Sequence, residues 1–325
     1  MIRTRLYRDG KCVKENFDPA EISDHLELQD ACVVWLDLDD ARPEDLALIA
    51  EEFGLNPLAV EDARNERQRP KLDHYDDHVF ISLYDVALDD GKGTLAAHEL
   101  AIFAADRYLI TVRKTPGYSM DAVVARWDDN AQLAKYGVGF LLWGLLDVVV
   151  DSHFDTVQKL DDRIDGLEDL LFDPEDTGTA VQRQSYELRK SLVRIRRVVL
   201  PTREVLNSLM RRENDLVADA LMPYYQDVYD HVLRAADWTD SLRDLVSTIL
   251  ETHLTIQGNR MNEIMKKVTS WAAIAAVPAV ITGYYGMNVL TYPHTGTRAG
   301  GYAALGLMAG LVAALYVVFK KIDWL

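Results

Sequence analysis

The sequence predicts an α/β domain followed by long helices and two C-terminal transmembrane helices. Three observations support this fold class. Residues 268–285 and 302–319 each run 18 residues without a charged side chain or histidine, close to the roughly 17 to 25 that a spanning helix needs. Short β-rich runs alternate with amphipathic stretches up to about residue 130. Beyond Pro223, no proline or paired glycine interrupts the chain until Pro278.

The N-terminal part, residues 1–135, reads as the cytoplasmic α/β domain. The β-branched and aromatic runs predict strands and the amphipathic runs predict helices. The expected strands are 32–38, 79–88, 100–104 and 108–112, and the expected helices are 43–53 and 57–63. The domain has no glycine-rich phosphate loop, nucleophile elbow or His-Glu-x-x-His motif. We therefore expect a protein that is not an enzyme and has no organic cofactor.

A long helical hairpin is expected over residues 136–222. The apolar run 137–150 resembles a third span, but Asp147 interrupts it and it is too short, which favours a buried core helix. This helix should continue to Asp173-Pro174, and a second should run from Thr179 to Arg212.

The remaining chain predicts a stalk that enters the membrane. A cytoplasmic stalk helix is expected over 223–267, followed by a first span over 268–288, an external loop over 289–301, a second span over 302–319 and a tail over 320–325. One helix of more than fifty residues should join the stalk to the first span. Such a length requires partners, and parallel copies of the same chain are the simplest ones.

The distribution of basic residues predicts the orientation. They flank both spans on one side: Arg260, Lys266, Lys267, Lys320 and Lys321. By the positive-inside rule both termini are cytoplasmic, in a multi-pass protein of the cell membrane. The N-terminus lacks the apolar run of a signal peptide, which agrees with this orientation. Two buried helices of a soluble core are the alternative.

Charge also limits the partners. The formal net charge is −17; residues 258–325 carry six Lys or Arg and two acids, a net of +4, so −17 − 4 = −21 remains on residues 1–257. This balance disfavours nucleic acid and anionic lipid headgroups and favours cations, although an ordinary soluble surface is the simpler reading. Cys12 and Cys32 are too few for a disulfide framework and lack zinc-site spacing.

A stripe of small or neutral polar residues follows the first span at alternating spacings of three and four. Parallel copies with this face inward would enclose a narrow conduit, although small residues also serve simple helix packing. The stripe consists of Asn262, Met265, Thr269, Ala272, Ala276, Ala279, Gly283 and Gly286.

Neither span contains an acidic residue, so a conduit here has no fixed negative charge. Removing water from a small dication is costly, and such an ion should therefore pass largely hydrated. A ring of Asn288 amide carbonyls at the outer end could accept hydrogen bonds from the water bound to the ion.

The tetrad Tyr285-Gly286-Met287-Asn288 between two C-terminal spans resembles the signature of the CorA family of divalent cation channels and transporters. Four further segments agree with that family over nearly the whole chain beyond residue 60. They are Gln68-Arg69-Pro70-Lys71, Pro201-Thr202-Arg203-Glu204-Val205-Leu206, Asp227-Val228-Tyr229-Asp230-His231 and Asn259-Arg260-Met261-Asn262-Glu263-Ile264-Met265-Lys266.

The resemblance implies a homopentamer with a cytoplasmic α/β funnel, a stalk helix that becomes the pore-lining first span, and an outer second span. It implies a selectivity filter at Gly286, Met287 and Asn288, and pore-facing positions for Asn262, Met265, Thr269, Ala276 and Ala279. The transported ion would be hydrated Mg2+, with Co2+ or Ni2+ also admitted.

The resemblance further implies gating by cytoplasmic Mg2+ bound between subunits. Asp227 matches the stalk motif, and Asp89 with Asp90 matches the facing acidic position. Acidic side chains facing one another across an interface repel until a dication bridges them. For Asp227 alone, an ordinary acid near a helix N-terminus, favoured by the helix dipole, is the alternative.

The outer loop differs from typical magnesium-carrying members. Val289 to Gly300 contains no acid and carries His294 and Arg298. A zinc transporter resembling ZntB is therefore an alternative within the superfamily. A membrane-tethered scaffold or sensor is the alternative from another class, and the small-residue stripe argues against it.

Overall fold

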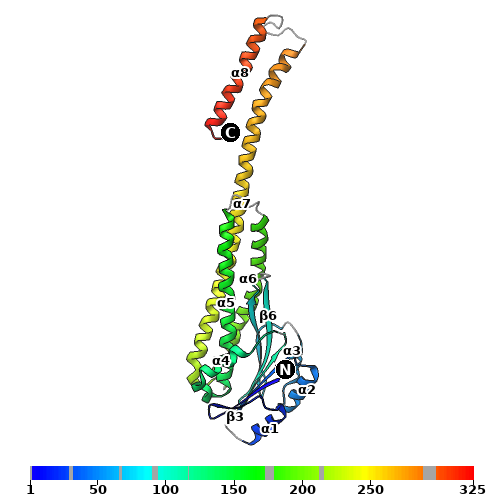
Figure 1. The fold of residues 1–325 in the computed structure, drawn as a ribbon, viewed down its shortest axis with the longest axis vertical. Helices are drawn as coiled ribbons and strands as arrows, with labels where there is room; N and C mark the ends of the chain where they lie inside the picture. Colours follow the sequence, from blue (N-terminus) through cyan, green and yellow to red (C-terminus); the bar gives the residue numbers. More distant parts are fainter. Residues whose placement is uncertain are drawn as a thin grey trace. The chain divides into compact units, whose positions relative to one another are not determined.

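A computed structural model describes residues 2–28, 32–65, 68–89, 94–115, 117–172, 179–211, 216–287 and 298–325. The chain divides into two units at Ile249 and Leu250. The N-terminal unit holds a mixed sheet and the helices that cover it, and the C-terminal unit holds two long helical segments (Figure 1).

The sheet has seven strands in the order β2-β1-β3-β7-β6-β5-β4. Only the central β3–β7 pair is parallel; the other described neighbours are antiparallel. The strands are β1 (Ile2–Arg8), β2 (Lys11–Glu15), β3 (Cys32–Asp39), β4 (Lys71–His74), β5 (Val79–Leu88), β6 (Leu95–Ala104) and β7 (Tyr108–Arg113).

Three short helices contribute to the core on one face of the sheet. They are α1 (Ile22–Leu28), α2 (Pro43–Glu52) and α3 (Pro57–Arg64), with a 3-10 turn at Pro19–Glu21 before α1. Leu36 and Leu38 of β3 pack in one apolar cluster with Leu46 of α2 and Ala59 of α3. Asn56 caps α3 by accepting a hydrogen bond from the amide of Leu58 at 2.9 Å, which satisfies one free donor of the first turn.

Three further helices, one short and two long, pack elsewhere against the sheet. They are α4 (Asp121–Asp129), α5 (Val138–Leu171) and α6 (Thr179–Leu209), with a 3-10 segment at Ala131–Tyr136 between α4 and α5. Helix α5 contacts β5 and β7, and α6 contacts β4, β5 and β6. Trp35 of β3 meets Trp127 of α4 edge to face at 4.9 Å, so β3 is buried on both faces, as central strands are.

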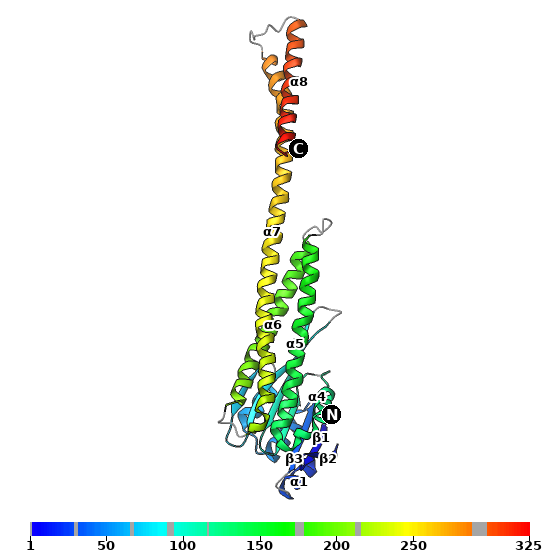
Figure 2. The ribbon, with the colours of Figure 1, turned by 90° about the vertical axis from the view of Figure 1, so that its left-hand side faces the viewer.

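Helix α7 (Met222–Gly286) follows a 3-10 turn at Asp219–Leu221 and is one helix of 65 residues. Its first part packs beside α5 and α6 in the N-terminal unit (Figure 2). The buried Tyr225 hydroxyl donates to the carbonyl of Gly139 in α5 at 2.9 Å, and the Trp238 ring lies 5.2 Å from Phe154. The expected single helix of more than fifty residues is therefore confirmed.

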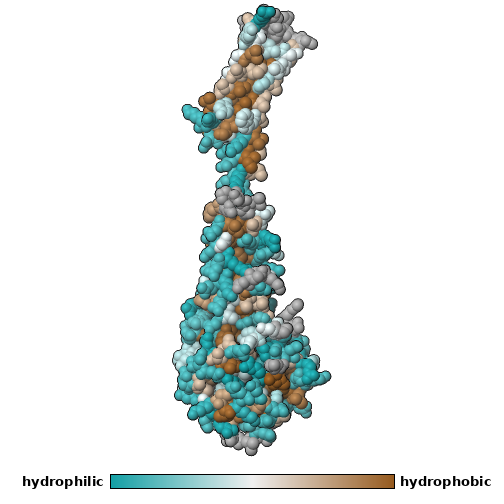
Figure 3. Space-filling view, in the orientation of Figure 1, coloured by the Kyte–Doolittle hydropathy of each residue, from teal (hydrophilic) through white to brown (hydrophobic). Residues whose placement is uncertain are grey.

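The C-terminal unit contains the end of α7 and helix α8 (Arg298–Lys321), which lie side by side in both ribbon views (Figures 1 and 2). Both helices are long and apolar enough to cross a membrane. Apolar side chains gather on their surface (Figure 3), and Trp271, Val280, Leu305 and Leu311 are exposed. Arg298, expected in the outer loop, is the first residue of α8.

The expected strands and helices appear with small shifts in their ends, and β6 begins five residues earlier than expected, at Leu95. The expected core helix over 137–150 is the start of α5; its Asp147 is buried and forms an ion pair with Arg126 of α4. Three strands, β1, β2 and β4, were not expected from the sequence. The pair Asp9-Gly10 has positive φ angles of 49° and 73°, and Asp-Gly is a common hairpin turn, so this signal marks the β1–β2 connection.

Candidate functional site

The predicted conduit residues lie on the solvent-exposed surface of α7 in the C-terminal unit. All eight stripe positions, Asn262, Met265, Thr269, Ala272, Ala276, Ala279, Gly283 and Gly286, are exposed within a single chain. Nothing among the described residues lies within 4 Å of a Cβ built on Gly283 or Gly286. This face is therefore free to meet other copies of the chain.

The opposite side of α7 faces α8. Ser270, Ile274 and Ile281 are buried, and α8 is the other element that the structure describes in this unit. Ala272 and Ala276 each stand two residues from Ile274, and Ala279 and Gly283 each stand two residues from Ile281. Side chains two residues apart in the sequence point about 160° apart around the axis of a helix with 3.6 residues per turn. The stripe therefore points away from α8.

A cavity of about 600 Å³ lies at the Asn262 end of the stripe. Asn262, Met265 and Thr269 line it together with Trp324 from the segment after α8. The Trp324 ring stacks on Phe319 at 5.9 Å. Trp324 was not predicted as a site residue, because a single aromatic residue near the end of a sequence carries no periodic signal.

The predicted filter begins where α7 ends. Gly286 is the last residue of α7, and the amide of Met287 donates to the carbonyl of Tyr284 at 3.4 Å. The Met287 side chain is exposed. Asn288, with the remaining loop through residue 297 that includes His294, lies outside the described residues.

Asp227 lies in the second turn of α7, with 70% of its side chain exposed. His231 follows it by one helical turn and stands between two acids. Its Nε2 is 4.0 Å from Asp227, and its Nδ1 is 3.7 Å from Asp151 of α5. Asp151 in turn accepts from Arg126 at 3.0 Å. The spacing of Asp227 and His231 in the sequence indicates this proximity, whereas the contribution of Asp151 depends on tertiary packing.

Asp89 follows β5, and its amide donates to the carbonyl of Thr94 at 3.0 Å. Asp90 lies outside the described residues. Over the part of the chain that the structure describes, no three His, Cys, Asp or Glu side chains form a group that could hold a metal ion. A single chain thus does not bring Asp89 and Asp227 together into such a group.

Asp230 and Arg234 stand four residues apart on α7, a spacing at which opposite charges on a helix often pair. Instead, Arg234 Nε lies 3.4 Å from the Asp230 carbonyl, and the Asp230 carboxylate accepts from Gln226 at 3.1 Å. The amide of Gln226 satisfies the carboxylate without a second charge.

The sheet domain, the 65-residue helix and the two apolar C-terminal helices define a two-span membrane protein with a large extramembrane unit. Residues 30–321 match the family model for CorA-like Mg2+ transporter proteins. The chain belongs to this family.

Relatives and solved structures agree with that assignment. The chain is 32% identical to the cobalt/magnesium transport protein CorA of Thermotoga maritima, over 95% of this chain and 88% of that protein. It is 24% identical to the zinc transport protein ZntB of Yersinia pseudotuberculosis, over 90% and 88%. The complete structure of the CorA magnesium transporter from Methanocaldococcus jannaschii superposes with a TM-score of 0.81 at 22% identity, covering 100% of this chain and 99% of that one.

Proposed function

We propose that this protein is a channel-type transporter that moves hydrated Mg2+ across the cell membrane, and that it also admits Co2+ or Ni2+. The observation that carries the proposal is the small-residue face of α7, which points away from α8 and ends at Gly286-Met287. Membership of the CorA-like family supports it. Five parallel copies of α7 with this face inward would form the wall of the conduit, and α8 would lie outside them.

The lining suits a hydrated ion. Thr269 supplies a hydroxyl, whereas Ala276, Ala279 and Gly283 supply little bulk, and none of them is charged. A dication with its water shell needs width and weak polar contacts more than direct ligands, because it loses water reluctantly. At the outer end, the Asn288 amide oxygens would accept hydrogen bonds from the water bound to the ion.

Both termini are assigned to the cytoplasm in this proposal. Lys266 and Lys267 precede the apolar part of α7, and Lys320 and Lys321 end α8, so the basic residues lie at the same side of both spans. The Asn288 loop then faces outward, and the sheet unit faces the cytoplasm, where it meets Mg2+ that has already entered.

Regulation by cytoplasmic Mg2+ is assigned to Asp227 of one subunit and Asp89 with Asp90 of its neighbour. Carboxylate oxygens are the ligands that Mg2+ takes from proteins, and the exposed Asp227 carboxylate is free to face a second chain. A bound dication would offset the repulsion between these acids and hold adjacent subunits in one arrangement.

Zinc transport is the second candidate. Arg298 at the start of α8 and His294 in an outer loop without acids favour it, because positive charge at the mouth weakens recruitment of dications from outside and imidazole is a preferred zinc ligand. The similarity to ZntB agrees with this candidate, but its identity is lower than the 32% to the cobalt/magnesium protein.

Uptake into liposomes tests the proposal. Purified protein should take up Mg2+, and Asn288→Ala should abolish that uptake, because the amide ring is lost. The same assay with Co2+, Ni2+ and Zn2+, with and without a proton gradient, separates the two candidates. Normal Mg2+ uptake by the Asn288→Ala variant would remove Asn288 from the filter, and uptake of Zn2+ alone would favour the zinc transporter.

A further inference from the structure

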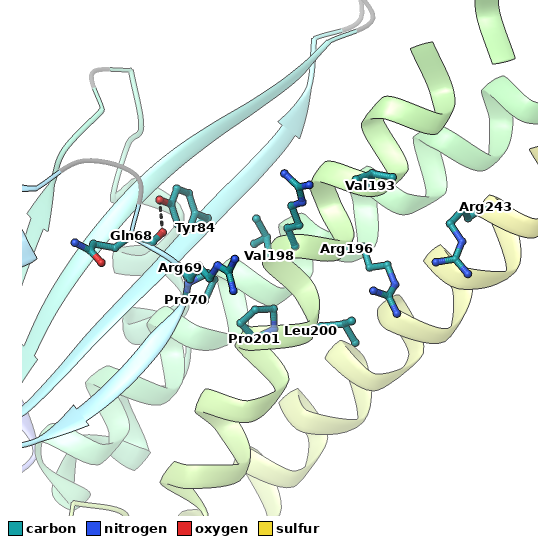
Figure 4. A pocket seen from close by; sticks show the side chains of 11 residues that line it. Gln68, Arg69, Pro70, Tyr84, Val193, Arg196, Val198, Leu200, Pro201 and Arg243 are labelled. Atoms are coloured by element: carbon teal, nitrogen blue, oxygen red, sulfur yellow. Dashed lines mark hydrogen bonds between the residues drawn. The ribbon is translucent and has the colours of Figure 1, made fainter. Parts of the chain in front are cut away.

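An arginine-lined cavity lies in the N-terminal unit, apart from the residues assigned to transport. Its volume is about 640 Å³, within the roughly 300 to 1,000 Å³ of typical small-molecule sites. Figure 4 shows the loop that carries Arg69 on one side, α6 in the middle and Arg243 of α7 on the other side. Four arginines line it, Arg69, Arg196, Arg197 and Arg243, and none of the other described lining residues is acidic.

Two of these four arginines have a carboxylate partner. Arg196 Nε donates to Asp240 Oδ1 at 2.6 Å, and Arg243 Nη1 lies 3.4 Å from the same oxygen. Arg69 and Arg197 make no ion pair or hydrogen bond through their side chains with any residue that the structure describes. Arg69 and Arg197 are exposed at this cavity, and a bound anion would neutralise their charges.

The loop that presents Arg69 is held in place. The Tyr84 hydroxyl donates to the carbonyl of Gln68 at 2.6 Å, and the amide of Gln68 donates to Glu99 at 3.3 Å. The buried Glu99 is paired with Lys114 at 2.7 Å. Arg69 therefore extends from a fixed backbone, which lowers the entropy lost when its side chain binds a ligand.

Two of the segments that resemble the CorA family meet at this cavity, although neither belongs to the conduit. Arg69 and Pro70 come from the segment 68–71, and Pro201 comes from the segment 201–206. All three residues also line an adjoining cavity of about 500 Å³. Pro201 lies inside α6 and has no N–H to donate to the carbonyl of Arg197, four residues earlier. The carbonyl of Arg197, one of the two unpaired arginines, therefore lacks its usual N–H donor although α6 continues through Pro201.

We propose that this cavity binds a small anion that carries two or more phosphate groups. The planar guanidinium fork matches phosphate oxygens in two parallel hydrogen bonds. The chain around the cavity is strongly acidic, with a net charge of −21 on residues 1–257, so a long polyanion is repelled. A small anion is held by the local charges, because charges beyond about 8 to 10 Å are screened at physiological ionic strength.

Calorimetric titration of the full-length protein with inorganic tripolyphosphate, in detergent and free of divalent cations, tests this proposal. Wild type should bind, and Arg69→Ala and Arg197→Ala should each weaken binding by about tenfold or more, the scale of a lost charged hydrogen bond. Arg69→Lys should recover part of the loss, because it restores the charge without the fork. Titration with ATP and with adenosine then separates a nucleotide from a free phosphate compound.

Arg183→Ala is the matched control. Arg183 lies on α6 and is exposed, as Arg197 is, but it is paired with Glu187. This substitution should leave binding unchanged. Absence of tripolyphosphate binding by the wild type would overturn the proposal, as would equal weakening by Arg183→Ala. If nothing binds and the double variant Arg69→Glu/Arg197→Glu breaks the oligomer in size-exclusion chromatography, the cavity is instead a contact for an acidic surface of a second copy.

Discussion

At the scale of single residues, His153 shows how one side chain joins two layers of the N-terminal unit. It is fully buried in α5, and its Nε2 lies 2.8 Å from the carbonyl of Tyr84 in β5. Strand β4 pairs with β5 only as far as Ser82, so the rest of that edge of β5 has no strand partner among the described residues. Thr156 also donates to this edge, to the carbonyl of Val86 at 2.9 Å.

Burial lowers the pKa of His153 below its usual 6.5, because a charged imidazole is poorly solvated there. The unfolded chain therefore binds a proton at higher pH than the folded one. The stability that neutral His153 provides is complete above about pH 6.5 and is lost as the pH falls below that value. We expect His153→Gln, which keeps a donor but cannot titrate, to show a smaller fall in apparent unfolding temperature between pH 7.5 and pH 5.5.

Near-ultraviolet circular dichroism during heating measures this difference at one fixed scan rate. His74→Gln is the control, because His74 is exposed on β4 and the same replacement there leaves the core unchanged. If acidification lowers the apparent unfolding temperature of His153→Gln and of the wild type by the same amount, His153 does not contribute to the acid sensitivity.

At the scale of elements, α7 combines two kinds of surface in one helix. In the N-terminal unit it packs against other helices through buried residues such as Val228 and Val232. In the C-terminal unit Ile274 and Ile281 face α8, while the opposite face remains free. The sequence predicted both its length, from the lack of breakers, and its small-residue stripe, from the spacing of three and four.

Other elements were harder to predict for physical reasons. The strand β2 is exposed along its whole length, so it lacks the apolar alternation that marks a strand, and only Asp9-Gly10 signals it. The four residues of β4 are likewise too short for a periodic pattern. The arginine-lined cavity was not predicted at all, because Arg69, Arg197 and Arg243 are far apart in the sequence and only the packing of a loop on two helices brings them together.

At the scale of the whole molecule, the proposed regulation depends on contacts between subunits. Asp227→Ala should yield channels that are less inhibited by internal Mg2+, because one of the facing acids is lost. The measurement is uptake into liposomes preloaded with increasing Mg2+, reported by a second transported ion such as Co2+. Asp230→Ala, three residues later on the same helix, is the control and should keep normal inhibition. Unchanged inhibition in Asp227→Ala would exclude Asp227 as a regulatory ligand.

The central claim is that the face of α7 turned away from α8 lines the ion path, and a matched pair of substitutions tests it most directly. Ala279 lies on that face, and Ala313 is exposed on α8. Ala279→Leu adds the same volume as Ala313→Leu, but five copies of it would converge on a narrow conduit. Mg2+ uptake by intact oligomers in liposomes should fall at least about tenfold for Ala279→Leu and remain near wild type for Ala313→Leu. Normal uptake with Ala279→Leu, or an equal loss with both, would contradict the account.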